Sequence, residues 1–524
     1  MIVHATDTPA PREGKDVERV VAMNCADRRR HRRISVAGWL TFVLAALFCL
    51  AIVWPFVVGA GWEQLRHPVF DSDDGHAVIV SLLCAAADAI LMILLATPLS
   101  WILARREFPG KVLLEALALV PLLTPPLAMG MLLANVLGPE SMLGQLADRV
   151  GISVTNSIPA LIIAGFYAAA PFYVFGAKLA FESVHPGYEE MARLLGKSRI
   201  AAWLGVTLPL ALGGLFWALV IGWLRAMGEF GVAIIIAYFP HGIPIQMWVN
   251  LQDSGPHAVY PLLWMLILLA MPVPLLLSLQ VRRGWKDWYG VVGGLATILC
   301  SFTAPKAEDL DKYQAASGHA QPVSLHIHTQ ISSPVRLHAD FTVRGITALT
   351  GPTGSGKTTL LRAIAGLISN NPTPETQSAL AGLRIGYAPQ QPLLFPHLSA
   401  LHNVAFGIHS PLRQRRAMDS LRQLGLEHLA DRMPALLSAG QAQLVSIARA
   451  VASEPDILLL DEPTAALDFE TSDALLVVLR DIARARNIPI LLATHDRDVA
   501  RSADVWYGIH NGGLSIAEVP VHRV

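Results

Sequence analysis

The sequence predicts an all-α membrane domain with six transmembrane helices, followed by a soluble α/β domain. Of the 524 residues, 53% are hydrophobic and only 15% are charged, which is more apolar than the usual composition of soluble domains. Long apolar runs fill the first half of the chain, whereas a glycine-rich phosphate-binding loop and short apolar runs lie in the second. Basic and acidic residues number 40 each, so the charge gives no indication of a nucleic-acid partner.

Apolar and polar stretches divide the chain into five segments. They are a cytoplasmic tail at 1–36, a transmembrane domain at 37–283, an interfacial segment and linker at 284–321, an α/β domain at 322–517 and a tail at 518–524. The first tail ends in a basic cluster before the run from Val36 to Ala60. This run is too long for a secretory signal, so we expect a retained membrane helix. The apolar run from Val291 to Phe302 is too short to span, so we expect it at the membrane interface.

Six apolar runs reach the ~20 residues that a helix needs to cross a bilayer. They cover about 36–60, 77–104, 112–136, 158–180, 206–238 and 258–281. Lysine and arginine gather in the connections at 105–111 and 193–199 and after the sixth run, whereas acidic residues prevail in the external connections. Basic connections stay in the cytoplasm, so we expect the tail and the α/β domain on the cytoplasmic side.

A strand, a glycine-rich turn and a helix are predicted from residue 346 onward. Ile346–Leu349 is strand-like, and Thr358 and Thr359 begin the helix. The turn consists of Gly351, Pro352, Thr353, Gly354, Ser355, Gly356 and Lys357. Its backbone N–H groups and the helix N-terminus favour a bound phosphate. Lys357 is expected to hold the β- and γ-phosphates of ATP, and the Thr358 hydroxyl to bind Mg²⁺.

A second apolar run, Ile457–Leu460, ends in two acidic residues. A buried parallel strand brings the residues that follow it to the ligand-binding edge of the sheet. Asp461 is therefore predicted to hold Mg²⁺, and Glu462 to polarise the attacking water as a general base. The alternative, that both acids only cap a strand, is disfavoured by the phosphate-binding loop.

With four further motifs, the segment 322–517 resembles the ATP-binding cassette family. These are the signature Leu437-Ser438-Ala439-Gly440-Gln441, the Q-loop Gln390, the D-loop Asp468 and the switch His495. The resemblance implies that Gln390 and His495 assist hydrolysis, with Gln390 also near Mg²⁺. It further implies that the signature of one chain closes over ATP bound by a second copy, which predicts a homodimer. Two departures are Ala439, where the family has glycine, and the absence of an aromatic residue between Val323 and Asp340 to stack on adenine.

The predicted cytoplasmic loop before the fifth span resembles the coupling loop of importer permeases. The matching positions are Glu190, Ala192, Gly196, Leu208 and Pro209. The resemblance implies two short helices joined at Gly196, which dock into the cassette near Gln390. The alternative is an ordinary amphipathic loop, which would not require this glycine and proline. The motif favours import and disfavours an exporter.

The predicted spans also resemble the permeases for molybdate, tungstate and sulfate. The resemblance is carried by the stretches 121–126, 171–172, 180–182 and 225–231. Arg225 is a candidate contact for an oxyanion in the membrane, but an ion pair with Glu229, one turn away, is favoured over that direct contact. For Asp88 we expect a polar packing partner rather than proton transport.

Together these features predict a fused permease and ATPase that imports a tetrahedral oxyanion with ATP and Mg²⁺. Molybdate is favoured, and sulfate, thiosulfate and tungstate are the alternative substrates. The resemblance implies a bacterial cytoplasmic membrane protein that receives its substrate from an extracytoplasmic binding protein. A rival of another class is a membrane-tethered regulatory ATPase that does not transport.

Overall fold

The computed structural model describes residues 71–273 except 152, and 324–516 with gaps at 332–336, 369–379, 381, 409 and 511–512. Between 43 and 54 it describes only a few helical positions, and position 276 stands alone. The expected interfacial run, the linker and both tails lie outside the described residues, as does most of the first predicted span. The chain forms two compact units, which we describe separately: residues up to Val80 with His241–Ala270, and Ser81–Pro240 with the residues from Met271 onward.

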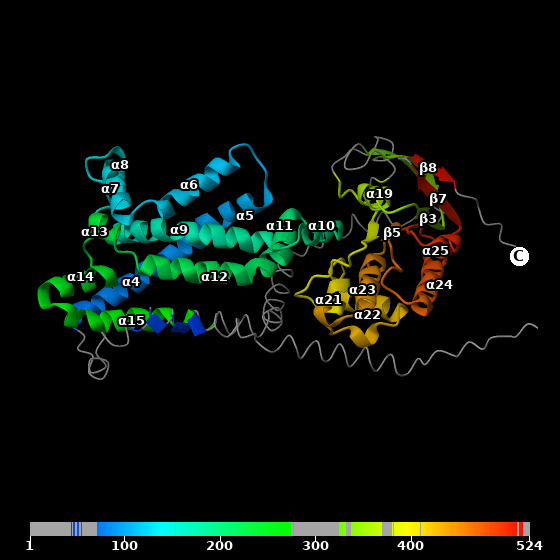
Figure 1. Cartoon of the computed structure of the whole chain (residues 1–524). Helices are drawn as coiled ribbons and strands as arrows, with labels where there is room; N and C mark the ends of the chain where they lie inside the picture. The colour runs from blue at the N-terminus through cyan, green and yellow to red at the C-terminus, as the bar shows by residue number, and fades with distance from the viewer. Residues whose placement is uncertain are drawn as a thin grey trace, which may run out of the picture. The chain divides into compact units, whose positions relative to one another are not determined.

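Three long apolar helices form the frame of the membrane domain (Figure 1). The first runs from Ser72 to Arg105 as α4 (Ser72–Leu91), a π-helical turn η1 (Met92–Ala96) and α5 (Thr97–Arg105). The second is α9 (Ile158–Glu182). The third joins α11 (Arg199–Ala202), the π-helical turn η2 (Trp203–Thr207) and α12 (Leu208–Met227). Each is long and apolar enough to cross a bilayer.

Small residues let α9 and α12 run side by side (Figure 1). A Cβ on Gly176 would lie 2.8 Å from the Cβ of Ala218, and a Cβ on Gly214 would lie 2.5 Å from the Cβ of Ala180. Larger side chains at these glycines would force the helices apart. The contact is the small-residue packing by which membrane helices associate without a hydrophobic driving force.

The third predicted span is bent rather than straight, which corrects the expectation of one helix over 112–136. It consists of α6 (Lys111–Leu123) and α7 (Pro126–Leu137), which meet at 112°. The break has a physical cause in the sequence Thr124-Pro125-Pro126. A residue before proline is driven out of the helical region, and Thr124 is extended with φ −87° and ψ 133°.

The fifth predicted span, 206–238, extends beyond the C-terminal end of the helix that the structure shows. Helix α12 stops at Met227, and a loop leads to the single turn α13 (Ala233–Ile236). After α7 the short helix α8 (Met142–Arg149) precedes α9. In the described part of the chain, three helices can span a bilayer, or four if the bent pair is one span; six spans are therefore not confirmed.

The unit containing His241–Ala270 includes α14 (Ile243–Ser254), the 3₁₀ turn η3 (Pro256–Val259) and the short apolar helix α15 (Tyr260–Ala270). A line of side-chain hydrogen bonds runs through it. His241 contacts Gln246 at 2.8 Å, Gln246 donates to Asn250 at 2.9 Å, and Asn250 donates to Asp74 at 2.9 Å. This polar chain fixes the start of α4 to α14.

The predicted α/β domain is confirmed as an eight-stranded mixed sheet with the order β1-β2-β8-β7-β3-β6-β5-β4. The strands are β1 (Leu325–Ile331), β2 (Leu337–Val343), β3 (Ile346–Thr350), β4 (Ile385–Ala388), β5 (Ile457–Asp461), β6 (Ile490–Ala493), β7 (Val505–His510) and β8 (Gly513–Ile516). Five neighbouring strands, β7 to β4 in that order, are parallel, while β1 pairs antiparallel with β2 and β7 with β8.

Helices cover both faces of the parallel strands. They are α19 (Lys357–Ile364), α21 (Ala400–Ala405), α22 (Arg413–Gln423), α23 (Ala439–Ala452), α24 (Phe469–Arg486) and α25 (Arg497–Arg501), with 3₁₀ turns η4 (Glu427–Leu429) and η5 (Pro434–Leu436). Strand β5 is buried throughout. Its Leu458 and Leu460 pack in one core with α23 and α24, and Leu459 packs in another with α19. This alternation follows from the two-residue period of a strand.

Candidate nucleotide and coupling site

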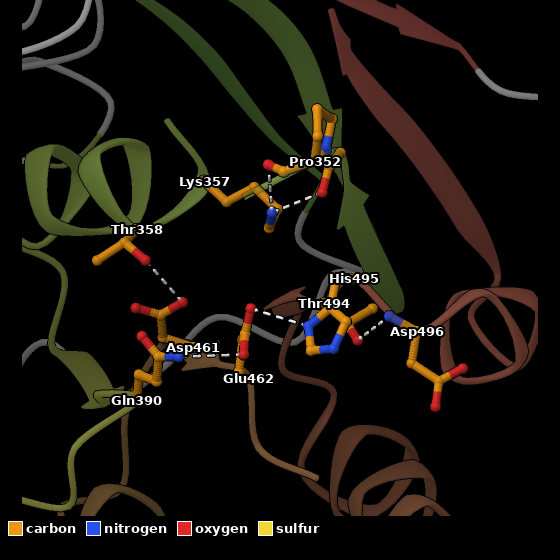
Figure 2. A network of polar contacts seen from close by, with 10 residues as sticks. Pro352, Lys357, Thr358, Gln390, Asp461, Glu462, Thr494, His495 and Asp496 are labelled. Atoms are coloured by element: carbon orange, nitrogen blue, oxygen red, sulfur yellow. Dashed lines mark hydrogen bonds and ion pairs between the residues drawn. The ribbon is translucent and has the colours of Figure 1, made fainter. Parts of the chain in front are cut away.

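The glycine-rich turn connects β3 to α19 and has the geometry of a phosphate cradle. Gly354 and Gly356 have φ values of +83° and +101°, which side chains rarely adopt. A Cβ on Gly351 would lie 2.7 Å from the Ser355 Oγ. The Lys357 side chain returns to its own loop, where Nζ donates to the Gly351 carbonyl at 2.7 Å (Figure 2).

Two buried polar atoms in this region have no hydrogen-bond partner among the described residues, namely the Ser355 Oγ and the Asp461 Oδ2. A buried polar atom without a partner is unfavourable, and both atoms lie where a nucleotide and its cation would supply one. Burial lowers the pKa of Lys357. A bound anion would oppose this shift, because a nearby negative charge favours the charged ammonium. The residues present therefore fit a phosphate group.

Thr358 near the start of α19 and Asp461 at the end of β5 bring two side-chain oxygens together. The Thr358 hydroxyl donates to the Asp461 Oδ1 at 3.2 Å, and Asp461 is 1% exposed (Figure 2). Burial raises the pKa of Asp461 to about 6, although the hydrogen bond from Thr358 opposes this change. A hydroxyl and a carboxylate are ligands that Mg²⁺ prefers, so this pair fits the cation that accompanies ATP.

The three residues predicted to serve hydrolysis lie in one row. Glu462 contacts the His495 Nδ1 through Oε1 and accepts from the Gln390 Nε2 through Oε2, both at 3.1 Å (Figure 2). Its backbone has φ +47°, a strained conformation of the kind that concentrates at functional sites.

The signature motif begins α23 with a capping box. The Ser438 Oγ accepts from the Gln441 N–H at 3.1 Å, and the Gln441 side chain accepts from the Ser438 N–H at 3.0 Å. Ala439 is accommodated in the first helical turn, and it is absent from the residues with positive φ. A Cβ on Gly440 would lie 2.9 Å from the Ala466 carbonyl, so the signature packs closely on the D-loop.

Asp468 caps α24 by accepting from the Thr471 N–H at 2.8 Å. Within the described residues, no hydrogen bond joins Ser438, Gly440 or Gln441 to the turn 351–357 of the same chain. The Ser438 and Gln441 side chains each accept from the other residue's backbone N–H, and both bonds are exposed. The start of α23 is thus capped within its own chain while its capping groups stay at the surface.

The predicted coupling loop forms α10 (Pro186–Leu194), a left-handed turn at Gly196 with φ +84°, and then α11. Ala192 is fully buried, and Leu208 and Pro209 open α12. Glu190 forms an ion pair of 3.0 Å with Arg362 on α19, the helix that follows the phosphate cradle. The coupling loop therefore contacts the helix that begins with Lys357.

Several further contacts join this loop to the cassette segment after Gln390. The rings of Tyr188 and Phe395 are 6.4 Å apart, and Lys197 lies 5.4 Å above the ring of Phe406. The imidazole Nε2 of His397 contacts the Gly205 carbonyl in η2 at 3.1 Å. Burial lowers the pKa of His397 to about 4, so the ring is neutral and Nε2 acts as the donor.

Four residues at this interface were not predicted from the sequence, namely Arg362, Phe395, His397 and Arg449. Arg449 is fully buried on α23 and donates to the Pro392 and Leu393 carbonyls. The available signal for Arg449 was a single charged residue in the largely apolar run 444–452. The others carry no local pattern, because their partners lie far away in the sequence.

In the membrane domain, Arg225 and Glu229 form the expected ion pair. The Glu229 side chain is 3% exposed and also accepts from the Val232 N–H at 2.8 Å. Asp88 is 1% exposed, and its partner is the backbone of Phe166 rather than a side chain. Its Oδ1 has no partner among the described residues.

A helical membrane domain joined to a cassette with these motifs defines an ATP-driven membrane transporter. The family model described as the binding-protein-dependent transport system inner membrane component matches residues 96–304, and that of the ABC transporter matches residues 336–465. The chain therefore belongs to the ABC transporter family, as a permease fused to its ATPase. It binds ATP and couples hydrolysis to transport.

Each half is similar to separate proteins in other organisms. Over 250 residues the chain is 34% identical to a probable molybdenum ABC transporter permease protein of Haloferax volcanii, covering 47% of this chain and 91% of that one. The molybdate/tungstate import ATP-binding protein WtpC of Archaeoglobus fulgidus is 40% identical over 34% of this chain and 80% of its own. The spermidine/putrescine import ATP-binding protein PotA of Pseudomonas fluorescens is 36% identical, over 33% of this chain and 54% of its own length.

Proposed function

We propose that this protein imports molybdate across the cytoplasmic membrane, driven by ATP. The observation that carries the proposal is the likeness of the membrane half to a molybdenum permease along 91% of that permease. The cassette half alone would not decide the substrate, because it is similar to both a molybdate/tungstate and a polyamine importer subunit. The permease forms the path, so its likeness carries more weight.

We assign ATP hydrolysis to Gln390, Glu462 and His495, which form one row of contacts near the ends of β4, β5 and β6. Lys357 and the N–H groups of its loop bind the phosphates, and Thr358, Asp461 and Gln390 would hold Mg²⁺, which would neutralise charge that develops on the phosphates. Glu462 accepts the proton of the attacking water. His495, 3.1 Å from the Glu462 carboxylate, orients that carboxylate and contacts the γ-phosphate.

Two copies of the chain are required for a complete site. Ser438, Ala439, Gly440 and Gln441 begin α23 with exposed hydrogen-bonding groups, and a helix N-terminus favours an anion. In a homodimer, this N-terminus closes over the ATP held by Lys357 of the partner copy, with Asp468 beside it. Each dimer then has two ATP sites and two permease halves.

The transported anion requires a positive or hydrogen-bonding group inside the membrane. Arg225 is the candidate, because its side chain remains 32% exposed although its charge is paired with Glu229. The ion pair keeps the guanidinium in one orientation and prevents tight binding of the oxyanion. An extracytoplasmic binding protein delivers the substrate, and the cassette lies on the cytoplasmic side where ATP is available.

Uptake by proteoliposomes tests the proposal. The full chain is reconstituted with its binding protein, and entry of labelled molybdate is measured with ATP on the cassette side. We expect ATP-dependent uptake that tungstate inhibits strongly and sulfate weakly. Preferential uptake of sulfate would show that sulfate, and not molybdate, is the substrate. ATPase activity that responds to no oxyanion, without uptake, would instead support a regulatory ATPase and refute import.

A further inference from the structure

The segment Pro389–Phe395 lies between the nucleotide site and the coupling helix α10, and it belongs to no strand or helix. The second residue of this segment is Gln390, which matches the Q-loop glutamine. Leu393 has φ +42°, which is unfavourable for a branched residue. Something outside the segment must therefore hold its shape.

Helix α23 supplies that support. Its Gln443 donates to the Pro389 carbonyl at 3.3 Å. Arg449 donates to the Pro392 carbonyl at 2.8 Å and to the Leu393 carbonyl at 2.9 Å, and its guanidinium lies 5.4 Å from the centre of the Phe395 ring. Both ends of the segment are thus bonded to the helix that begins with the signature.

Burying an arginine at position 449 is energetically unfavourable if its only role is to fill space in the core. The residue is 1% exposed, and it forms no ion pair among the residues that the structure describes. Burying a charge without a counter-ion is unfavourable, and an apolar side chain of similar volume would pack as well. What only arginine provides here is a planar pair of donors for two successive carbonyls.

The other side of the segment contacts the permease. A Cβ on Gly187 of α10 would lie 3.0 Å from the Leu393 Cδ1, so the two residues are in close contact. Tyr188, the next residue of α10, packs against Phe395 with ring centres 6.4 Å apart. The residues that Arg449 holds are therefore the residues that the coupling helix contacts.

We propose that Arg449 is a positioning residue for transport, which makes the signature helix and the coupling helix move together through Leu393 and Phe395. The inference rests on the proposed function, since it describes how nucleotide closure reaches the permease. When the signature approaches the nucleotide of the partner copy, α23 moves and Arg449 carries Pro392 and Leu393 with it. Gly187 and Tyr188 then follow.

The test uses three single variants of the full chain, and the double variant of the first two, in proteoliposomes with the binding protein. Arg449→Lys keeps the charge but not the paired donors, and Leu393→Ala shortens the contact with Gly187 while leaving the carbonyls that Arg449 binds. The matched control is Arg486→Lys, because Arg486 also donates to a backbone carbonyl of α23, that of Val451 at 3.1 Å. ATP hydrolysis and molybdate uptake are measured on the same vesicles.

Both test variants should keep basal ATPase, while the molybdate transported per ATP falls about fivefold or more. The double variant should be no worse than the more severe single one, because both act on one link. The control should keep the wild-type ratio. Three results would overturn the proposal. They are an unchanged ratio of molybdate transported to ATP hydrolysed in Arg449→Lys, a loss in the double variant equal to the product of the two single losses, and an equal loss of hydrolysis and uptake.

A second readout does not depend on the substrate. In wild-type protein, addition of ATP should change hydrogen exchange in both α23 and α10. In Arg449→Lys the change in α23 should remain and the change in α10 should be lost. If wild-type protein hydrolyses ATP without uptake, the proposed function fails, yet this exchange experiment still decides the role of Arg449. Retention of the α10 response in the variant would refute that role.

Discussion

Asp461→Asn is expected to stabilise the nucleotide-free cassette at neutral pH while weakening its response to Mg·ATP. Asp461 is 1% exposed, and burial raises the pKa of its carboxyl to about 6 from 3.8. A difference of one pH unit between the folded and unfolded pKa corresponds to about 1.4 kcal/mol, so the ionised carboxylate destabilises the folded state by up to about 3 kcal/mol. Asparagine keeps an acceptor for the Thr358 hydroxyl, which donates to Asp461 at 3.2 Å, but has no charge to bury.

The same numbers give the sign of the pH dependence. Above pH 6 the carboxyl is ionised in both states, and the penalty is complete. As the pH falls from about 6 toward 3.8, the folded state takes up the proton first and becomes relatively more stable. Between pH 7.5 and pH 5 this group should stabilise the wild-type protein by about 1.4 kcal/mol. Asp461→Asn should show no such contribution.

Hydrogen exchange of the β5 and β6 amides in the full-length protein reports the unfolding free energy of the cassette. It is measured at pH 7.5 and pH 5, with and without Mg·ATP. Saturating nucleotide at about 100 times its Kd should add about 2.7 kcal/mol to the wild type and clearly less to the variant. If Asp461→Asn is less stable than wild type at pH 7.5 without nucleotide, or gains as much from Mg·ATP, the reasoning is wrong.

Three further predictions concern other charged groups. Glu462→Gln should bind ATP normally but hydrolyse it about 10²–10⁴-fold more slowly, as phosphate release would show; rapid hydrolysis would exclude it as the base. Glu190→Arg and Arg362→Glu should each reduce uptake per ATP and restore it when combined, with stability changes below about 1 kcal/mol because the pair is partly exposed; no rescue would mean that the pair does not couple. Arg225→Gln should destabilise the protein by about 3–5 kcal/mol, because it leaves the buried Glu229 charge without a partner, and thermal unfolding with Glu229→Gln added should show partial recovery.

The backbone of the candidate nucleotide site could be predicted because its motifs are local. The turn Gly351–Lys357 requires glycines at left-handed positions, and Gly354 and Gly356 have φ values of +83° and +101°. Asp461 follows a short run of apolar residues that predicts a buried strand, and β5 ends at that residue. In such cases the chemistry and the backbone are encoded within a few residues.

The bend of the third span also has a local cause in the sequence, but a hydropathy average does not detect it. An average over about 20 residues gives the same value for one straight helix and for two helices that meet at Thr124. A residue before proline is disfavoured in the helical conformation, and a sum of hydropathy values takes no account of this effect. Similarly, the apolar residues of α13 extended the predicted fifth span beyond Met227.

The contacts of the coupling loop could not be predicted in this way. Glu190 and Arg362 are far apart in the sequence, as are Gly205 and His397, and no periodicity links them. Each pair depends on how the permease and the cassette surfaces meet. The sequence motif indicated that docking occurs near Gln390, but the partners are decided by long-range packing.

The coupling helix is connected to the cassette by two separate routes, and their origins differ. One runs from Lys357 along α19 to Arg362 and Glu190, and so responds to the nucleotide that this copy binds. The other runs from the signature along α23 to Arg449 and Leu393, and in the proposed homodimer it would respond to the nucleotide that the partner copy binds. Because both routes end on α10, each permease half receives information from both ATP sites. In the proposed dimer, a defective signature in one copy should therefore interrupt the second route of that copy alone, because the other permease half keeps its own signature and its own α19.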